Sequence, residues 1–500
     1  MPKFYITTSI MYTNAPPHIG FALELVQADA VARYRRMLGD DVRFLTGTDE
    51  HGTKNMRSAL EAGVPTQKFV DRIAGQVGDL ATRLDISNTD FIRTSDRVRH
   101  WPAAQKIWRA MAEKGDIYKK SYEGYYCVGH ESFVKQSELV DGLCPLHKNK
   151  PELIKEENWF FRITKYSAKI RELIESDRLR IVPSTRKAEI LNLLDNAEDV
   201  SFSRPSEQLP WGIPVPDDAS QTMYVWADAL TNYISALGYG TDGAAMAFWP
   251  ADVHLIGKDI VRFHAIFWPA MLISAGLEVP KSIYVHGFVT VEGEKMSKSL
   301  GNVVDPLGLL NSYSADVVRY FMLRELQSTD DSDFSYKNLE NRYNTDLANG
   351  LGNLVQRVAT LVATKLSGRA VYTADLEVTE SVLRQVLDDT DYQNAFEQFR
   401  LHDATASVWG KIALANAYLN EREPWKSSFA EASEDRQEGY KTLIVAVAMI
   451  AHIAWLLQPF MPATAQKISV VFGVPLDSHI ADGQQISVTV PEPLFPRKEA

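Results

Sequence analysis

The chain has 500 residues, of which 45% are hydrophobic and 23% are charged. This composition fits a globular protein of about two to four domains and excludes disordered, collagen-like and small disulfide-stapled chains. The net charge of −11 excludes a protein that holds nucleic acid by overall positive charge, although a local basic face is compatible with it. Cys127 and Cys144 are the two cysteines, and residues 1–5 do not resemble a signal peptide, so we expect a cytoplasmic protein.

The N-terminal residues alternate between strand and helix signals. β-Branched and aromatic residues fill 3–10, a proline-containing turn follows, and 19–38 carries long apolar side chains at helical spacing. A second strand is predicted at 42–46, and strands at 253–256 and 283–291 flank a predicted helix. This alternation predicts an α/β fold with a doubly wound parallel sheet.

Two further segments differ in texture. Residues 116–222 contain both cysteines, aromatic pairs and proline-rich ends, which predicts an insertion that splits the sheet domain. Beyond the second half of the sheet, helical patterns at 339–366, 393–419 and 440–457 predict an all-α bundle. The apolar run at 443–457 is shorter than the about 20 residues of a membrane span, so we interpret it as a buried bundle helix.

Two short motifs follow predicted strands that are far apart in the chain. His18 and Gly20 lie where the first strand leads into the first helix, and helix-start amides, a close glycine backbone and an imidazole donor suit a phosphate there. Lys295 and Lys298 lie in a small-residue loop after the strand 283–291 and suit a leaving pyrophosphate. Each motif alone has a structural alternative, a plain turn or a solvated basic loop. Together they indicate a nucleotide site at the carboxyl edge of one parallel sheet.

The two motifs resemble those of a known enzyme family. His18-Ile19-Gly20-Phe21 and Lys295-Met296-Ser297-Lys298-Ser299 are similar to the signature motifs of class I aminoacyl-tRNA synthetases. Four other segments are similar to methionyl-tRNA synthetases in particular. These segments are 44–52, 224–229, 254–259 and 267–272. The resemblance extends from residue 3 to about residue 470.

The resemblance implies a Rossmann-like sheet domain that is split by a knuckle-bearing insertion and followed by a helical anticodon-binding domain. The expected segments are 1–115 and 223–292 for the two Rossmann-like halves, 116–222 for the connective insertion, 293–338 for the lysine loop and linking segment, 339–475 for the anticodon-binding domain and 476–500 for the tail. The chain does not resemble the appended C-terminal dimerisation domain of longer family members, so we expect a monomer.

The implied reaction joins L-methionine to ATP as methionyl-adenylate, releases Mg²⁺-pyrophosphate and transfers the methionyl group to the 3′ end of tRNA(Met). This chemistry needs positioned charge more than a protein nucleophile. Asp259 is a candidate for the ribose hydroxyls or, alternatively, for a helix N-cap. The resemblance implies that ATP is bound by His18, Gly20, Gly257, Asp259, Lys295 and Lys298. Of these, His18, Lys295 and Lys298 are expected to be catalytic.

The resemblance also implies a methionine pocket. Asp49 is expected to pair with the substrate ammonium, and aromatic rings are expected to enclose the polarizable thioether. A donor from Tyr233 or His264 would help to reject leucine. Leu230 stands where the family commonly has proline, and the aromatic residues taken alone would be interpreted as core packing. The pocket residues are Ile10, Asp49, Trp226, Ala229, Leu230, Tyr233, Phe263, His264 and Phe267.

Phe21 departs from the family, which usually has a second histidine at this position. A phenylalanine cannot donate a hydrogen bond to a phosphate, and the loss of one such donor can raise a barrier by about 3 kcal/mol. Either the lysines and the helix-start amides compensate, or the enzyme activates its substrate slowly. We favour compensation because the other expected active-site residues are present.

Two Cys-x2-His pairs lie within the insertion. Cys127 pairs with His130, and Cys144 pairs with His147. Two such pairs on facing turns can close a tetrahedral zinc site. The spacing matches the zinc knuckle of the family, with His130 where a cysteine is commoner. We expect a structural Zn²⁺, and the alternative is a metal-free remnant with two ordinary buried thiols.

The helical bundle is expected by resemblance to read the anticodon CAU. Asn353 and Arg357 are one helical turn apart, and Trp425 follows a proline at a helix end. An amide, a guanidinium and an indole suit unpaired bases. The alternative is a solvated helix face and an indole that plugs the bundle.

Other functions are alternatives. One is a tRNA-binding regulatory protein on a synthetase scaffold that Phe21 has made inactive, although Lys295 and Lys298 would then have no obvious use. Another is a plain nucleotidyltransferase, which would not need the anticodon residues. Isoleucine and valine relatives are disfavoured because the insertion is too short for their separate editing domain. We expect neither a membrane nor DNA as a partner.

Overall fold

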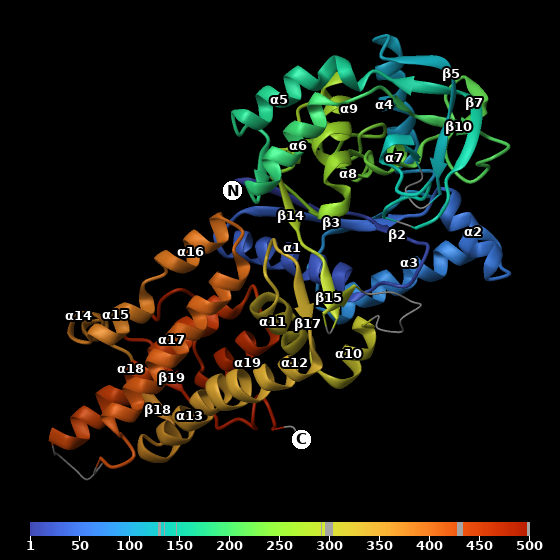
Figure 1. Ribbon diagram of the computed structural model, residues 1–500. Coiled ribbons are helices and arrows are strands. Elements are labelled where there is room, and N and C mark those ends of the chain that lie inside the picture. The colour runs from blue at the N-terminus through green and yellow to red at the C-terminus, as the bar shows by residue number, and fades with distance from the viewer. Residues whose placement is uncertain are drawn as a thin grey trace. The chain divides into compact units, whose positions relative to one another are not determined.

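The structure, a computed structural model, describes residues 1–128, 132–134, 136–146, 148–291, 293–295, 304–427 and 434–497 (Figure 1). The chain forms two compact units, Met1–Phe288 and Val289–Ala500, which we call unit 1 and unit 2.

Unit 1 is built on a seven-stranded sheet whose neighbouring strands are parallel. The order is β2-β3-β1-β13-β14-β8, with β4 also beside β3. In β1, Ile6 lies opposite both Phe44 and Val253, so this strand is central and buried. The strands are β1 (Lys3–Thr8), β2 (Met11–Tyr12), β3 (Asp41–Asp49), β4 (Asp90–Arg93), β8 (Arg180–Val182), β13 (Val253–Gly257) and β14 (Ser282–His286).

Helices cover both faces of this sheet. Figure 1 shows α1 and α3 on one side and α4, α8 and α9 on the other. This arrangement confirms the prediction of a doubly wound parallel sheet. The helices that bear on the site are α1 (Ile19–Met37), α2 (Thr53–Glu61), α3 (Thr66–Arg83), α4 (Trp101–Glu113), α7 (Val225–Ala229), α8 (Asn232–Ser235) and α9 (Trp268–Ser274).

The helix predicted after β13 forms in pieces rather than as one regular helix. A 3₁₀ turn at Lys258–Ile260 is followed by a π-helical turn at Phe263–Phe267 and then by α9. The N–H of Trp268 donates to the carbonyl of Phe263, five residues back. The cause is Pro269, which has no N–H and whose ring displaces the carbonyl one turn earlier. Such π-helical turns are frequent at functional sites.

Residues 116–222 form two antiparallel sheets of unit 1, with orders β6-β5-β7-β9 and β10-β12-β11. The same stretch supplies β8 to the main parallel sheet and carries α5 (Ser167–Glu175) and α6 (Thr185–Asp195). Its antiparallel strands are β5 (Ile117–Cys127), β6 (Ser132–Val134), β7 (Glu152–Phe161), β9 (Val200–Ser201), β10 (Ser203–Pro205), β11 (Pro214–Val215) and β12 (Asp218–Met223).

One hydrophobic cluster joins the main sheet to this stretch. It includes the wholly buried Trp268 together with Phe161 and Phe202, whose ring centroids lie 4.9 Å apart. Removing a side chain as large as Trp268 from such a core destabilises a protein by about 3–5 kcal/mol. The shared core explains why the inserted stretch and the sheet pack as a single unit.

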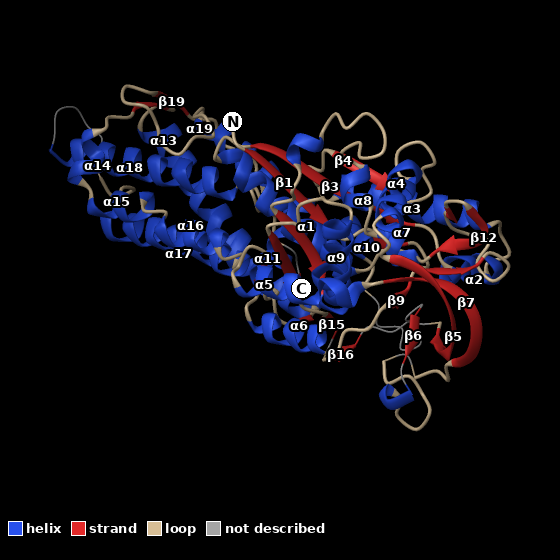
Figure 2. Cartoon of the chain, turned by 90° about the horizontal axis from the view of Figure 1, so that it is seen from above, coloured by secondary structure: helices blue, strands red, loops and turns tan. Residues whose placement is uncertain are grey.

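Unit 2 is mainly helical, and Figure 2 shows its helices in blue with few strands among them. A three-stranded sheet has the order β16-β15-β17, and β18 (Arg369–Val371) pairs with β19 (Gln485–Ser487). The other elements are β15 (Val289–Val291), β16 (Glu294–Lys295), β17 (Ser332–Phe334), α10 (Pro306–Ser312), α11 (Ala315–Glu325), α12 (Tyr336–Arg342), a π-helical segment (Tyr343–Gly352), α13 (Asn353–Lys365), α14 (Asp375–Thr379), α15 (Ser381–Leu387), α16 (Thr390–Glu397), α17 (Leu401–Arg422), α18 (Glu434–Leu457) and α19 (Pro462–Phe472).

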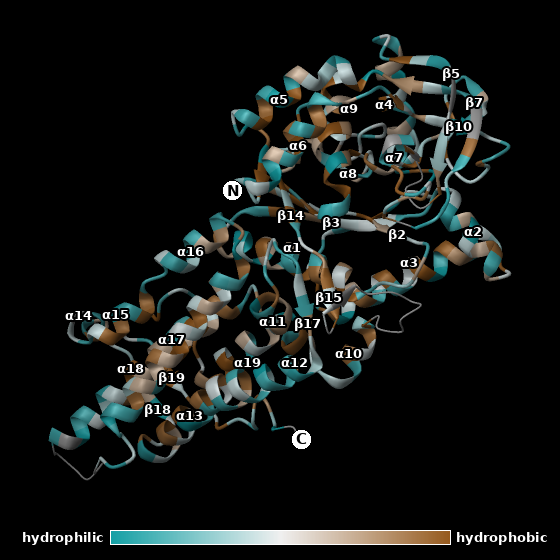
Figure 3. Ribbon diagram, in the orientation of Figure 1, coloured by the Kyte–Doolittle hydropathy of each residue, from teal (hydrophilic) through white to brown (hydrophobic). Residues whose placement is uncertain are grey.

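Helix α18, whose apolar C-terminal part is buried, lies in the core of unit 2. It packs against α13, α15, α17 and α19. By length and composition α18 is apolar enough to cross a membrane, but 83% of its apolar window is buried within the protein, as in a core helix. The interpretation of 443–457 as a buried bundle helix is confirmed. Figure 3 shows hydrophobic and hydrophilic residues side by side along the helices, as expected for packed amphipathic elements.

Candidate active site

The carboxyl ends of central strands meet at one edge of the main sheet, and α1 begins there. β13 ends at Gly257, and β14 ends at His286. His18 caps α1 in an extended conformation, and its carbonyl accepts hydrogen bonds from the N–H groups of Phe21 and Ala22. The parallel topology therefore gathers a helix start, a glycine backbone and two imidazoles in one place.

The side chain of His18 is oriented by the helix that it caps. Its Nδ1 accepts a hydrogen bond from the N–H of Gly20 at 3.1 Å. Since a neutral imidazole has one accepting and one donating nitrogen, the proton lies on Nε2. Loss of surrounding water lowers the pKa of His18, Asp259 raises it and His286 lowers it, and the net shift is downward. His18 is therefore neutral at pH 7, and its exposed ring offers an N–H donor.

Behind His18, a buried ion pair connects α1 to β14. Glu24 Oε2 lies 3.0 Å from His286 Nε2, and Glu24 Oε1 accepts from the N–H and the hydroxyl of Ser9, both at 2.6 Å. Nδ1 of His286 donates to the carbonyl of Gly287 at 2.8 Å. Both ring nitrogens therefore donate, which requires an imidazolium. Burial opposes this charge, but Glu24 outweighs burial and raises the pKa of His286.

Gly257 and Asp259 complete this edge. The capping position of the 3₁₀ turn after β13 is Gly257, so the alternative interpretation of Asp259 as the helix N-cap is wrong. A Cβ atom on Gly257 would lie 2.9 Å from Asp259 Oδ1 and 3.5 Å from His286 Nε2. The charge of Asp259 raises the pKa of both His18 and His286, so its carboxylate lies within electrostatic range of both rings. The structure thus places His18, Gly257 and Asp259 at the same edge of the sheet, and their roles in ATP binding stay predictions.

Aromatic side chains from α7 and the π-helical turn form a wall. The rings of Trp226 and Phe263 are stacked, with centroids 3.9 Å apart and planes 7° apart. Phe263 meets Phe267 edge-on at 5.0 Å, and Trp226 meets His264 edge-on at 6.0 Å. A wall of this kind suits an apolar, polarizable side chain.

Tyr233 and His264 are hydrogen-bonded to each other, and His264 is also hydrogen-bonded to the backbone. Nδ1 of His264 donates to the carbonyl of Ile260 at 3.0 Å, and Nε2 lies 2.6 Å from the Tyr233 hydroxyl. Burial lowers the pKa of His264 to about 4, so its ring is neutral and Nε2 accepts the tyrosine proton. In this arrangement both protons are committed, so the expected donor to sulfur from one of these residues stays a prediction.

The turn after β3 fixes Asp49, which is 7% exposed. Its carbonyl accepts from the N–H and Oγ1 of Thr13 at 3.0 and 3.1 Å and from Asn55 Nδ2 at 3.2 Å. The next residue, Glu50, is wholly buried and accepts two hydrogen bonds from Arg93 at 2.6 and 2.9 Å. Because these hydrogen bonds fix the turn, the Asp49 carboxylate is held in one position, which suits the binding of an ammonium group.

Comparisons with known proteins decide the family. The family "tRNA synthetases class I (M)" matches residues 4–150 and 134–359, and the "Anticodon binding domain of methionyl tRNA ligase" matches residues 370–494. The methionine–tRNA ligases of Brucella suis biovar 1 (strain 1330) and Rhizobium meliloti (strain 1021) are 41% and 40% identical to this chain, covering 99% of it and 98% of each relative. The chain belongs to the class I methionyl-tRNA synthetase family.

The fold agrees with this family over the whole chain. It is similar to Mycobacterium tuberculosis methionyl-tRNA synthetase in complex with methionyl-adenylate, with a TM-score of 0.93, 39% identity and coverage of 99% of this chain and 100% of that one. For the apo form of that synthetase the TM-score is 0.87 at 36% identity, covering 100% of this chain and 99% of that one.

Two further pocket residues expected for a methionyl-tRNA synthetase, Ala229 and Leu230, adjoin Trp226 of the aromatic wall in the chain. Ala229 ends α7 and Leu230 follows it, and both are buried. The N–H of Leu230 donates to the carbonyl of Trp226. A proline at this position cannot make that bond, so Leu230 adds a backbone tie to the pocket. Ile10 is half-buried against the core cluster of unit 1.

The two lysines of the signature loop belong to unit 2. Lys295 ends β16, which pairs antiparallel with β15. Asp333 anchors this hairpin by accepting from the N–H of Gly293 at 2.8 Å and from Thr290 Oγ1 at 2.7 Å. Lys298 lies outside the described residues. The roles of both lysines stay predictions.

Cys127 and Cys144, from the predicted zinc knuckle, are both wholly buried, and neither described sulfur is in a disulfide. Asn149 links their segments: its Oδ1 accepts from Cys127 Sγ at 3.5 Å, and its carbonyl accepts from the N–H of Cys144 at 2.9 Å. His130 and His147 lie outside the described residues. Within the described part of the chain, three or more possible metal ligands do not gather in one place.

In unit 2 the predicted anticodon residues come from two elements. Asn353 and Arg357 lie on α13, and Trp425 follows α17 and is 37% exposed. Arg357 donates to Asn420 Oδ1 at 2.8 Å and to Asn416 Oδ1 at 3.2 Å, and its guanidinium is 5.5 Å from the centre of the Trp425 ring. The structure therefore joins Arg357 and Trp425 and adds two asparagines that the sequence did not single out.

Three buried ionisable residues near the site were also not predicted: Glu24, His286 and Asp228. Glu24 and Asp228 stand in apolar stretches of α1 and α7, and His286 ends a buried strand. A charged residue inside an apolar segment is rare unless it is paired. That signal identifies such residues as important, but it does not identify their partners.

Proposed function

We propose that this chain activates L-methionine with ATP to form methionyl-adenylate and then transfers the methionyl group to the 3′ end of tRNA(Met). The observation that carries the proposal is the His18 imidazole, whose tautomer is set by Gly20 so that Nε2–H is exposed beside Gly257 and Asp259. Family membership supports the same reaction, and so does the similarity to a synthetase in complex with methionyl-adenylate.

In the first step, His18 Nε2–H donates to the ATP phosphates, which approach the backbone at Gly20, and Asp259 accepts from the ribose hydroxyls. The methionine carboxylate attacks the α-phosphate, the α–β phosphoric anhydride bond breaks, and pyrophosphate leaves with its Mg²⁺. Lys295 and Lys298 neutralise the charge that develops on pyrophosphate, an assignment supported by the resemblance of their loop. The charge of the His286 imidazolium is already balanced by Glu24. We therefore assign His286 to holding β14 and α1 together rather than to binding phosphate.

The amino acid is held by Asp49 at its ammonium group and by Trp226, Phe263 and Phe267 at its side chain. Because Tyr233 and His264 are hydrogen-bonded to each other, they present a neutral, aromatic surface to the thioether. Methionine is then selected mainly by shape and by contacts between sulfur and aromatic rings, which contribute about 0.3–1.5 kcal/mol each.

A structural Zn²⁺ would be held by Cys127, His130, Cys144 and His147. The two cysteines fit this role because both thiols are wholly buried in a small antiparallel segment and are not oxidised to a disulfide. Two thiolates and two imidazoles form a closed tetrahedral set. The metal would cross-link turns whose apolar side chains Val140, Leu143 and Leu146 are exposed and therefore pack in no core.

Arg357, Asn353 and Trp425 bind the CAU anticodon of tRNA(Met), with the indole stacking on a base. The contact of Arg357 with Asn416 and Asn420 supports this assignment, because it fixes the guanidinium beside Trp425. The protein works as a monomer in the cytoplasm, where ATP, methionine and tRNA are present.

The test is methionine-dependent exchange between ATP and labelled pyrophosphate, followed by charging of a tRNA with a CAU anticodon. We expect methionine, and neither leucine nor cysteine, to stimulate exchange and the same tRNA to be charged. Stimulation by leucine would refute the choice of substrate. Binding of tRNA without any exchange would instead establish a regulatory protein on a synthetase scaffold.

A further inference from the structure

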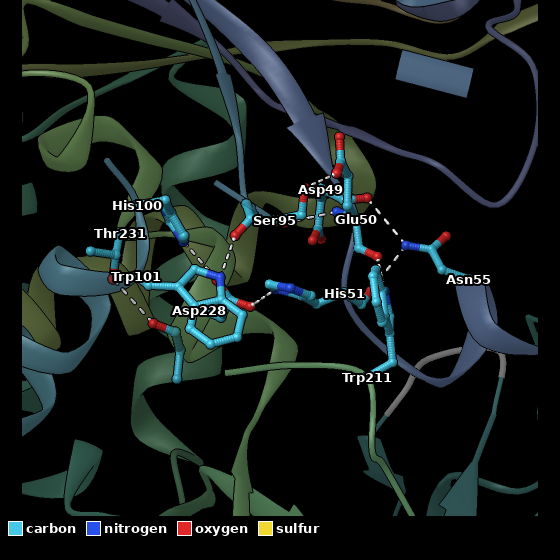
Figure 4. Close-up of polar contacts among 12 residues, drawn as sticks. Asp49, Glu50, His51, Asn55, Ser95, His100, Trp101, Trp211, Asp228 and Thr231 are labelled. Atoms are coloured by element: carbon cyan, nitrogen blue, oxygen red, sulfur yellow. Dashed lines mark hydrogen bonds and ion pairs between the residues drawn. The ribbon is translucent and has the colours of Figure 1, made fainter. Parts of the chain in front are cut away.

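The carboxylate of Asp228 holds two histidines inside unit 1. Its Oδ2 lies 2.6 Å from His51 Nδ1, and its Oδ1 lies 2.7 Å from His100 Nε2 (Figure 4). Asp228 is 1% exposed. Burial raises the pKa of this carboxyl, but His51 and His100 outweigh burial, so the net shift is downward and Asp228 is ionised. A buried charge of this kind needs both partners, because a lost partner leaves an unbalanced charge.

Through His51, Asp228 is connected to the turn that carries Asp49. His51 is two residues beyond Asp49, and Asn55 Nδ2 donates to the carbonyls of both residues at 3.0 and 3.2 Å. The His51 ring meets the edges of Trp101 and Trp211, with centroids 5.9 and 5.7 Å apart. Packing on both sides leaves the ring little room to turn away from the Asp228 carboxylate.

On its other side, Asp228 is connected to the aromatic wall through α7 and through His100. Asp228 itself lies in α7 between Trp226 and Ala229. Nδ1 of His100 is 2.9 Å from Ser235 Oγ in α8, the short helix that also carries Tyr233. One carboxylate therefore connects the turn after β3, the start of α4, α7 and α8.

We infer that Asp228 is a positioning residue for methionine recognition: with His51 and His100 it fixes the separation between the Asp49 carboxylate and the aromatic wall at Trp226. The inference rests on the proposed function, since it needs Asp49 and the wall to bind opposite ends of one methionine. A ligand held at both ends loses affinity when the distance between the two contacts is no longer fixed. Asp228 does this without touching substrate.

The first test replaces Asp228 by asparagine and measures methionine binding directly. An amide has one acceptor and one donor, so Asp228→Asn cannot accept from both histidines. We expect the Kd for methionine, measured by calorimetry, to rise at least about tenfold, with the same rise in the KM for methionine in pyrophosphate exchange. The KM for ATP should stay within about twofold, because the ATP edge lies on other elements.

Isosteric histidine variants separate positioning from general loss of packing. The amide nitrogen of His51→Asn can donate from the place of Nδ1, and that of His100→Gln can donate from the place of Nε2. Both should keep methionine binding within about threefold of wild type. His51→Ala and His100→Ala should weaken it about tenfold. If Asp228→Asn does not fold, this comparison tests the proposal by itself.

Asp116 provides a matched control in the same unit. It is also a wholly buried carboxylate and accepts from Lys165, Tyr166 and Ser274, away from the pocket residues. Asp116→Asn should lower Tm about as much as Asp228→Asn and leave methionine binding unchanged. Equal methionine affinity in wild type and Asp228→Asn would overturn the positioning role alone. Wild-type protein that does not bind methionine would refute the proposed function and this role together.

Discussion

The imidazolium of His286 and the carboxylate of Glu24 form an ion pair with a separation of 3.0 Å between Nε2 and Oε2, and this pair joins the end of a central strand to the first helix. It lies near the predicted phosphate-binding residue His18, whose pKa is lowered chiefly by loss of surrounding water and further by the charge of His286. A buried charge pair therefore adjoins the candidate site.

Replacing Glu24 by glutamine should destabilise unit 1 by about 2 kcal/mol at pH 6, because a charge-assisted hydrogen bond is lost. The folded-state pKa of His286 is raised, so its contribution is complete below the unfolded pKa and is lost as pH rises through the folded pKa. Urea unfolding at pH 6 and pH 9 measures this: the difference between wild type and Glu24→Gln should shrink at pH 9. Asp29→Asn, on the same helix, is the control and should show no such change.

His264 should make the protein less stable in acid, with the opposite sign. Its folded-state pKa of about 4 lies below the unfolded value of 6.5, so the unfolded chain binds the proton more readily and stability falls as pH drops through this window. Between pH 7.5 and pH 5.5 this one group should account for about 1 kcal/mol of lost stability. His264→Gln should lose correspondingly less over the same interval in urea unfolding. An equal loss in both proteins would contradict a neutral, buried His264.

The larger features of the fold could be predicted because they follow from residue pattern. Residues 3–8 show little alternation of polar and apolar side chains and are rich in β-branched and aromatic types, as expected for a strand buried on both faces. After Pro17 the apolar residues recur at helical spacing. The helix after β13 was predicted in its position, but its division into 3₁₀, π and α turns depends on how Pro269 packs.

Within the candidate site, the sequence indicated which residues to consider, but it could not indicate where their protons lie. His18 was identified by its place before α1, but its tautomer depends on the Gly20 amide. The partner of Tyr233 is a histidine whose other nitrogen is engaged by a backbone carbonyl, which no spacing rule reveals. Long-range pairs such as Glu24 with His286 are set by tertiary packing between segments that are distant in the chain.

His18→Ala should lower kcat for pyrophosphate exchange about 100-fold without changing the Kd for methionine, because one donor to the developing phosphate charge is lost. His18→Gln can place an amide N–H near the position of Nε2 and should recover about a tenth of the wild-type rate. Phe21→Leu is the matched control: its side chain is buried and cannot donate, so kcat should stay within about threefold. A large loss in Phe21→Leu would mean that packing at the helix start, rather than donation by His18, limits the rate.

Purified protein from zinc-replete medium should contain one zinc per chain by elemental analysis. Cys127→Ser should abolish zinc binding and lower Tm, because a structural zinc contributes folding free energy. Treatment of wild type with a strong chelator should reproduce the lower Tm, and added Zn²⁺ should restore it. Zinc-free protein with the same Tm as the variant would instead support a metal-free remnant with two ordinary buried thiols.

Trp425→Ala should separate the two steps of the reaction. The indole is 37% exposed and its ring centre lies 5.5 Å from the guanidinium of Arg357, so it can stack on an unpaired base while the protein holds its other face. We expect kcat/KM for charging of tRNA(Met) to fall about 10- to 100-fold, which corresponds to the about 1–3 kcal/mol of one base–aromatic stack. Pyrophosphate exchange, which needs no tRNA, should be unchanged.

Trp425→Phe keeps an aromatic face and should retain most of the charging activity, which distinguishes stacking from the mere filling of space. Arg357→Lys tests the other half of the pair, because lysine keeps the charge but cannot hydrogen-bond to Asn416 and Asn420 with two nitrogens of one planar group. If the anticodon is read here, a tRNA with a changed anticodon should be charged poorly by wild type and lose little further activity in Trp425→Ala. Parallel losses for both tRNAs would place Trp425 in the stability of the bundle instead, since a residue that reads bases must discriminate between them.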